Sequence, residues 1–69
     1  MSAVRAEVNG ELVELPAGAT VAEVVASLCA DDRGVAVAVD REVVPRSCWK
    51  AVVIADGQSI EVVTAAAGG

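Results

Sequence analysis

The chain has 69 residues, the size of one small domain with little room for both a hydrophobic core and a deep enzyme cleft. Hydrophobic residues make up 55% of it, which suits a globular fold and argues against disorder. Since Trp49 is the one aromatic residue, the core must be built from Val, Ala, Leu and Ile. The net charge of -5, from ten acidic and five basic residues, disfavours nucleic acid and anionic membranes as partners; it favours a protein partner with a basic surface, although it serves solubility equally well.

The first predicted elements are two strands joined by a tight turn. Apolar and polar residues alternate over Val4–Val8 and again over Glu11–Leu15, which is the period of a half-buried strand. Asn9-Gly10 between them is a strong signal for a two-residue hairpin turn, because both positions need positive φ. This turn would place Ala6 opposite Val13 as an apolar pair on the core side of the sheet.

A single helix is predicted at Val21–Ala30, after a linker at residues 16–19. Thr20 and Glu23 have the spacing of a capping box, in which each side chain caps the other residue's backbone N–H. Residues at helical spacing then form one apolar stripe, made of Val21, Val24, Val25, Leu28 and Cys29. The helix should end before the turn residues Asp31-Asp32-Arg33-Gly34.

The second half of the chain predicts further strands. Val35–Val39 alternates valine with alanine, so a valine face should pack under the helix while the alanine face stays flat, apolar and shallow. Asp40-Arg41 indicates a turn, after which Glu42-Val43-Val44 pairs back until Pro45 ends the strand. The last strand is predicted at Ser59–Thr64.

A hairpin, a helix and then more strands predict an α+β domain in which the helix covers one face of the sheet. We expect this domain at residues 1–64, followed by a flexible tail at residues 65–69, and a monomer when the protein is free. The N-terminus has no long apolar run of the kind found in signal peptides, which favours the cytoplasm. Cys29 and Cys48 should then be free thiols.

Few side chains are candidates for chemistry. The absence of histidine excludes a His-based triad and a His metal site, and Asp31-Asp32 is interpreted as a turn, since no third metal ligand is near it. No metal site is therefore expected. Cys29 is interpreted as a core residue and Cys48 as an exposed thiol without a role. Trp49 is predicted to pack over the edge of the core.

The C-terminal Gly68-Gly69 is the strongest candidate site. Glycine is costly to order and is favoured where the backbone must pass without room for a Cβ atom. A di-glycine end can enter a narrow channel in another enzyme and present a carboxylate that ATP activates as an acyl-adenylate. We therefore predict that Gly69 is the reactive residue and that Ala67 and Gly68 are recognised in the channel; the alternative is a frayed end.

The alanine face of the third strand is a second candidate site. It is apolar and shallow, and the chain around it is acidic. We expect partners to dock on this face at Ala36 and Ala38, together with the tail, and to be steered there by charge.

Several segments together resemble the ThiS family, the sulfur carriers of thiamine biosynthesis, over nearly the whole chain. They are Asn9-Gly10-Glu11, Thr20-Val21, Gly34-Val35-Ala36-Val37-Ala38-Val39, Val43-Val44-Pro45-Arg46-Ser47, Trp49, Asp56-Gly57, Ile60-Glu61-Val62-Val63-Thr64 and Gly68-Gly69. The chain departs from the family's usual pattern at Asp40-Arg41, Cys48 and Gln58. The resemblance implies a ubiquitin-like β-grasp fold, in which a mixed sheet holds one helix and the first and last strands are parallel neighbours.

The resemblance also implies a function and partners. An adenylyltransferase of the ubiquitin-activating type would use ATP and magnesium to adenylate Gly69. A persulfide would then supply the sulfur of a thiocarboxylate, which a thiazole synthase would consume. The chain itself would be a protein co-substrate rather than an enzyme, would bind no cofactor, and would have neither nucleic acid nor membrane as a partner.

Other functions fit the same residues. The small subunit of molybdopterin synthase shares the fold and the di-glycine end, although it is usually longer and richer in Phe, and a sulfur carrier can serve another pathway such as cysteine synthesis. A ubiquitin-like interaction module would do no chemistry and need no free C-terminus. A protein modifier would use the same adenylation but leave lysine-linked conjugates in cell extracts.

Overall fold

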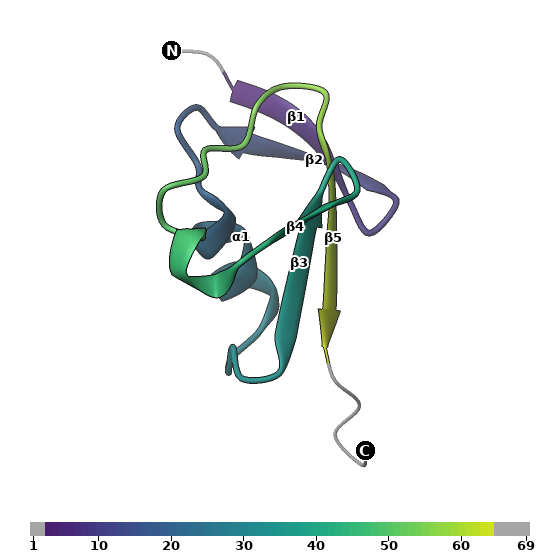
Figure 1. The fold of residues 1–69 in the computed structure, drawn as a ribbon. Coiled ribbons are helices and arrows are strands. Elements are labelled where there is room, and N and C mark those ends of the chain that lie inside the picture. The colour runs from purple at the N-terminus through teal and green to yellow at the C-terminus, as the bar shows by residue number, and fades with distance from the viewer. Residues whose placement is uncertain (1–2, 65–69) are drawn as a thin grey trace.

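The computed structural model describes residues 3–64, which form a five-stranded mixed sheet with one α-helix packed against it (Figure 1). The strands are β1 (Ala3–Val8), β2 (Glu11–Pro16), β3 (Val35–Val39), β4 (Glu42–Val44) and β5 (Ser59–Thr64). Their order in the sheet is β2-β1-β5-β3-β4; β1 and β5 are parallel and the other neighbours antiparallel. The predicted α+β class is confirmed, and so are the mixed sheet and the parallel pairing of the first and last strands that the β-grasp resemblance implied.

The hairpin of β1 and β2 has the predicted turn and register. Asn9 and Gly10 have φ values of 53° and 83°, and Ala6 lies opposite Val13. β2 continues through Pro16, one residue further than predicted. Proline has no N–H to donate, but this is tolerated because β2 is an edge strand and has no neighbouring strand on its outer side that would need the hydrogen bond.

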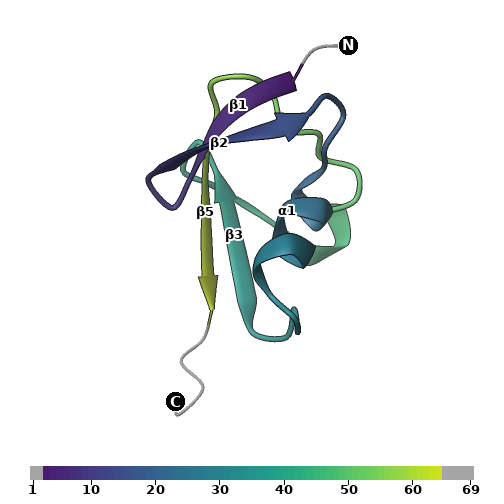
Figure 2. The same ribbon diagram turned by 180° about the vertical axis from the view of Figure 1, so that it is seen from behind.

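The helix α1 (Val21–Leu28) begins where the sequence predicted. The backbone N–H of Glu23 donates to Thr20 Oγ1 at 3.3 Å, and the N–H of Thr20 donates to Glu23 Oε1 at 3.0 Å, so the capping box is formed. Figure 2 shows α1 lying to one side of β3 and β5. Within the part of the chain described, no helix is long and apolar enough to cross a membrane.

The end of α1 differs from the prediction of Ala30. The helix ends at Leu28, because Cys29 already has extended backbone angles of -127° and 127°. The Asp31 carboxylate accepts a hydrogen bond from the N–H of Arg33 at 3.0 Å, a local turn that competes with helix. Leu28, which was expected in the apolar stripe, is 52% exposed at this end.

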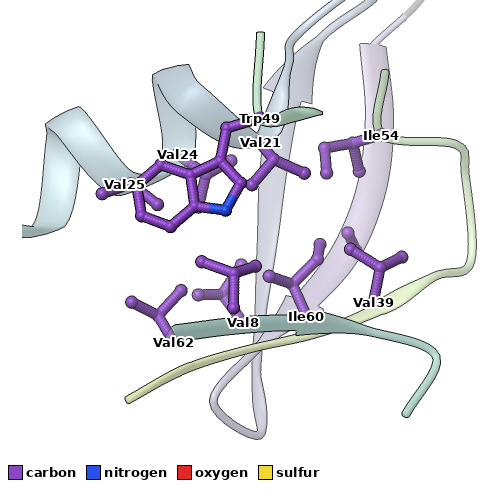
Figure 3. Packing of buried hydrophobic residues seen from close by; sticks show 11 residues of the cluster. Val8, Val21, Val24, Val25, Val39, Trp49, Ile54, Ile60 and Val62 are labelled. Carbon is purple, nitrogen blue, oxygen red and sulfur yellow. The ribbon is translucent and has the colours of Figure 1, made fainter. Parts of the chain in front are cut away.

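The core lies between α1 and the sheet (Figure 3). Its buried members come from α1, from β1, β3 and β5, and from the segment between β4 and β5. They are Ala6, Val8, Val21, Val24, Val25, Val37, Val39, Trp49, Ile54, Ile60 and Val62. The predicted valine face of β3 therefore packs under the helix, as Val37 and Val39 show.

The segment after β4 closes the edge of the core. It contains a short 3₁₀ helix, η1 (Arg46–Cys48), directly after Pro45. Trp49 follows it and is only 4% exposed, with its indole Nε1 donating to the carbonyl of Val44 at 2.9 Å. The predicted packing of Trp49 is confirmed, and its one polar atom has a partner.

Candidate functional site

Among the described residues, those of β5 are nearest in sequence to the predicted reactive end of the chain. The candidate residues Ala67, Gly68 and Gly69 lie outside the described residues. β5 leads to them from the middle of the sheet, where β3 pairs with it from Ile60 to Thr64 and β1 pairs with it at Ser59 and Ile60. The tail sequence therefore continues from a strand whose first residues are paired on both edges and whose last residues, Val63 and Thr64, are paired with β3.

The face of the sheet opposite α1 carries the second predicted site. Ala36 is exposed on this face and Ala38 is half-buried, so the predicted assignment of valines to the core and alanines to the outside is confirmed. Val63 of β5 lies opposite Ala36 and is 60% exposed, while Val43 of β4 lies opposite Ala38 and is 77% exposed. We call these four residues the alanine–valine patch.

The patch is larger than the two alanines that the sequence singled out. Val43 could have been found from the predicted turn, because a two-residue turn at Asp40 and Arg41 fixes it opposite Ala38; their φ values are 50° and 71°. The alternation within Ser59–Thr64 places Val63 on the face opposite Ile60 and Val62, but its place beside Ala36 depends on a pairing between distant segments. No local signal shows such a register.

The open face around the patch is acidic. The charged strand residues on this face are Arg5, Glu7, Glu14 and Glu61. The neighbours of each along its strand are buried or half-buried, so these four side chains point away from the core. Glu61 lies directly opposite Ala38, at the border of the patch. One guanidinium against three carboxylates gives this face a net charge of -2, which would attract a basic surface.

The acidic turn after α1 is structural. Arg33 donates to the Asp31 carboxylate at 2.8 Å, and this hydrogen-bonded guanidinium holds the pKa of Asp31 below its ordinary value. Arg46 forms an ion pair with Asp32 and also donates to its backbone carbonyl at 3.0 Å. Residues 3–64 contain no group of three acidic, Cys or His residues that could hold a metal.

The helix side of the molecule has a shallow groove of about 610 Å³ between α1 and the segment around η1. Cys29, Arg46, Trp49 and Lys50 are among its lining residues. Cys29 is half-buried against the core, in line with its predicted packing role, and Cys48 is exposed, as expected. The groove is on the opposite side of the sheet from the alanine–valine patch and is not part of that site.

Comparison with known proteins identifies the family. The model of the ThiS family matches residues 3–69. The crystal structure of the thiamine biosynthesis protein ThiS from Geobacter metallireducens has 28% sequence identity to the chain and a TM-score of 0.75, and the match covers 96% of this chain and 100% of that one. A search among curated proteins found no match. The chain therefore belongs to the ThiS family, the small sulfur carrier proteins of thiamine biosynthesis.

Proposed function

We propose that this chain carries sulfur as a thiocarboxylate on Gly69. Membership of the ThiS family supports a sulfur carrier. The observation that carries the proposal is the continuity of the alanine–valine patch with the end of β5. Val63 belongs to the patch and is followed by Thr64, the last residue of the strand, so a partner docked on the patch sits beside the start of the tail.

The proposed chemistry takes place on the terminal carboxylate. One oxygen of Gly69 attacks the α-phosphorus of ATP, pyrophosphate leaves, and an acyl-adenylate remains. The terminal sulfur of a persulfide then attacks the acyl carbon and AMP leaves, which gives an acyl disulfide. A thiol then attacks the donor's sulfur in this disulfide, forms a new disulfide with the donor, and releases the thiocarboxylate. Its sulfur is then available to a thiazole synthase, and the carboxylate is regenerated when an oxygen atom of the sulfur acceptor or of water replaces the transferred sulfur.

The partner in the first step is an adenylyltransferase of the ubiquitin-activating type, which would hold ATP and magnesium. The carrier's own contribution is to present the carboxylate in line with the α-phosphate, and positioning of this kind accounts for much of the catalysis in such reactions. Docking on the patch would bring the tail to the nucleotide. The net charge of -2 on the open face would steer the carrier to a basic surface of the partner.

The small residues of the tail support this role. Residues 65–69 are Ala-Ala-Ala-Gly-Gly, so no side chain larger than a methyl group would have to enter a channel. The partner must fix this segment during the reaction, and fixing each residue costs about 1–2 kcal/mol of conformational entropy. The two glycines would occupy the narrowest part, where a Cβ atom would collide with the channel wall.

The test is ATP–pyrophosphate exchange with the cognate adenylyltransferase. Gly68→Ala should leave the thermal unfolding curve unchanged and slow exchange by about a hundredfold, because a small displacement of the reacting group costs about that much. Deletion of Gly69 should slow it further, and Ala65→Gly, a change of similar size away from the carboxylate, should not. If both glycine variants exchange pyrophosphate as fast as the unmodified carrier, the proposal is wrong.

A second measurement identifies the product. The intact mass of the protein from its native host should include a species in which one sulfur replaces one oxygen, and this species should be lost after alkylation. Lysine-linked conjugates in the same extract, without this species, would instead identify a protein modifier.

A further inference from the structure

β5 extends beyond the strand that pairs with it in parallel. β1 pairs with β5 only as far as Ile60, because the chain turns away at Asn9 with its φ of 53°. β5 continues to Thr64, so its edge facing β1 would have no partner after Ile60. The N–H and C=O of Val62 point to this edge, because Val62 is two residues after Ile60, whose carbonyl accepts from the N–H of Asn9 at 2.9 Å.

The side chain of Asn9 fills the gap. Its Oδ1 accepts a hydrogen bond from the N–H of Val62 at 2.8 Å, and its Nδ2 donates to the carbonyl of Val62 at 3.3 Å. In a parallel sheet, the next peptide groups of β1 would make these two bonds. One carboxamide therefore replaces the part of a strand that the hairpin turn removes. We call this pair of hydrogen bonds the Asn9 clamp.

Asparagine meets two requirements at this position. It tolerates positive φ better than most residues, so it suits the first position of the turn. It also carries both a donor and an acceptor, which Val62 needs, whereas Asp would offer only acceptors and Gly would offer neither. The strength of Asn9-Gly10 as a turn signal does not reveal this second role.

We propose that Asn9 is a positioning residue for the adenylation of Gly69. This inference rests on the proposed function. The clamp holds β5 two residues before the strand ends, so it fixes the point and the direction in which the chain leaves the sheet. Without the clamp, β5 is held by β3 alone from Glu61 to Thr64, and the partner would have to order the end of this stretch in addition to the tail.

The hairpin of β3 and β4 offers a matched control. Asp40 is also the first residue of a two-residue turn, with a φ of 50°, and its carboxylate accepts a hydrogen bond from the N–H of Ser59 at 3.0 Å. Both residues thus hold β5 with a side chain, but Asp40 does so at the first residue of the strand. Asn9→Gly and Asp40→Gly keep both turns and add the same freedom to the unfolded chain.

The first measurement is amide hydrogen exchange by NMR, which requires no partner. The Val62 amide should exchange at least about tenfold faster in Asn9→Gly than in Asp40→Gly at equal global stability, because loss of its hydrogen bond permits local opening. In Asn9→Asp the acceptor remains, so this amide should stay protected. Equal Val62 protection in the two glycine variants would show that the clamp does not hold β5.

The second measurement is ATP–pyrophosphate exchange at a temperature where both variants are folded. Asn9→Gly should lower kcat about tenfold with little change in the KM for the carrier, since the docking patch is retained and only the reacting group is displaced. Asp40→Gly should match the unmodified carrier. Equal kcat values for the two variants would overturn the positioning role. If the unmodified carrier supports no exchange at all, the proposed function fails, whereas the Val62 amide still reports the clamp.

Discussion

The docking role of the alanine–valine patch can be tested by placing a charge in it. Ala36 is exposed on β3, and its cross-strand neighbour Val63 is exposed as well. Ala36→Arg can therefore extend its side chain into solvent in the free protein. We expect the free energy of unfolding to change by no more than about 0.5 kcal/mol, as for other surface substitutions.

The effect on the complex should be much larger. A partner that covers Ala36 must either desolvate the new guanidinium or move away from it, and a basic partner surface would also repel it. Like charges brought together in an interface cost several kcal/mol, so a loss of about 3 kcal/mol, or more than a hundredfold in Kd, is expected for the adenylyltransferase. Ala36→Glu should lose less, because its charge has the sign of Glu61 and attracts the same basic surface.

Isothermal titration calorimetry at low and high ionic strength measures this difference. Ala26→Arg is the matched control, because Ala26 is exposed on α1, which covers the other face of the sheet. It should bind the partner like the unmodified carrier. The reasoning is refuted if Ala36→Arg binds as tightly as Ala26→Arg. If the two Ala36 variants lose the same affinity at both ionic strengths, the patch is a docking site without charge steering.

Two further predictions concern stability and titration. Arg41→Gly should raise the free energy of unfolding, measured by urea denaturation, by about 0.5–1 kcal/mol. A φ of 71° costs an L-residue about 1–2 kcal/mol, and the flexibility of glycine in the unfolded chain offsets part of the gain from removing this strain. An unchanged free energy of unfolding would show that this turn is unstrained. Because Arg33 lowers the pKa of Asp31, the stability from Asp31 is present above the ordinary carboxyl pKa of 3.8 and is lost as the pH falls through the lowered value. In Arg33→Ala an NMR titration should show the Asp31 midpoint moving up toward 3.8 without the guanidinium, while the backbone N–H of residue 33 still donates to the carboxylate and lowers its pKa. An unchanged midpoint would contradict the role of the Arg33 side chain.

The elements that depend on neighbouring residues could be predicted from the sequence. The turn at Asn9-Gly10 together with alternating residues fixed the register of β1 and β2, and the Thr20 and Glu23 pair located the start of α1. The end of α1 was wrong by two residues, because the chain has no glycine cap there. What ends the helix is the extended backbone at Cys29 and the turn held by Asp31, and helical periodicity does not report either.

The candidate site was harder to predict than these elements, because its extent depends on pairing between strands that are distant in the sequence. Ala36 and Ala38 were found because the alternation in β3 is complete, but the width of the patch required the registers of β4 and β5. The Asn9 clamp could not be predicted for the same reason. Its hydrogen bonds join residues that only the parallel pairing of β1 with β5 brings together. The structure of residues 65–69, on which the proposed chemistry depends, stays a prediction.

The order of the strands has a consequence for how the protein is made. β5 is the last of the described strands along the chain, yet it lies in the middle of the sheet between β1 and β3. During synthesis the β1–β2 hairpin, α1 and the β3–β4 hairpin leave the ribosome before the strand that joins them. The sheet can therefore close only after Thr64 has emerged, and a chain released earlier exposes its valines to chaperones and proteases. A carrier that has folded has thus already been translated up to the start of its tail.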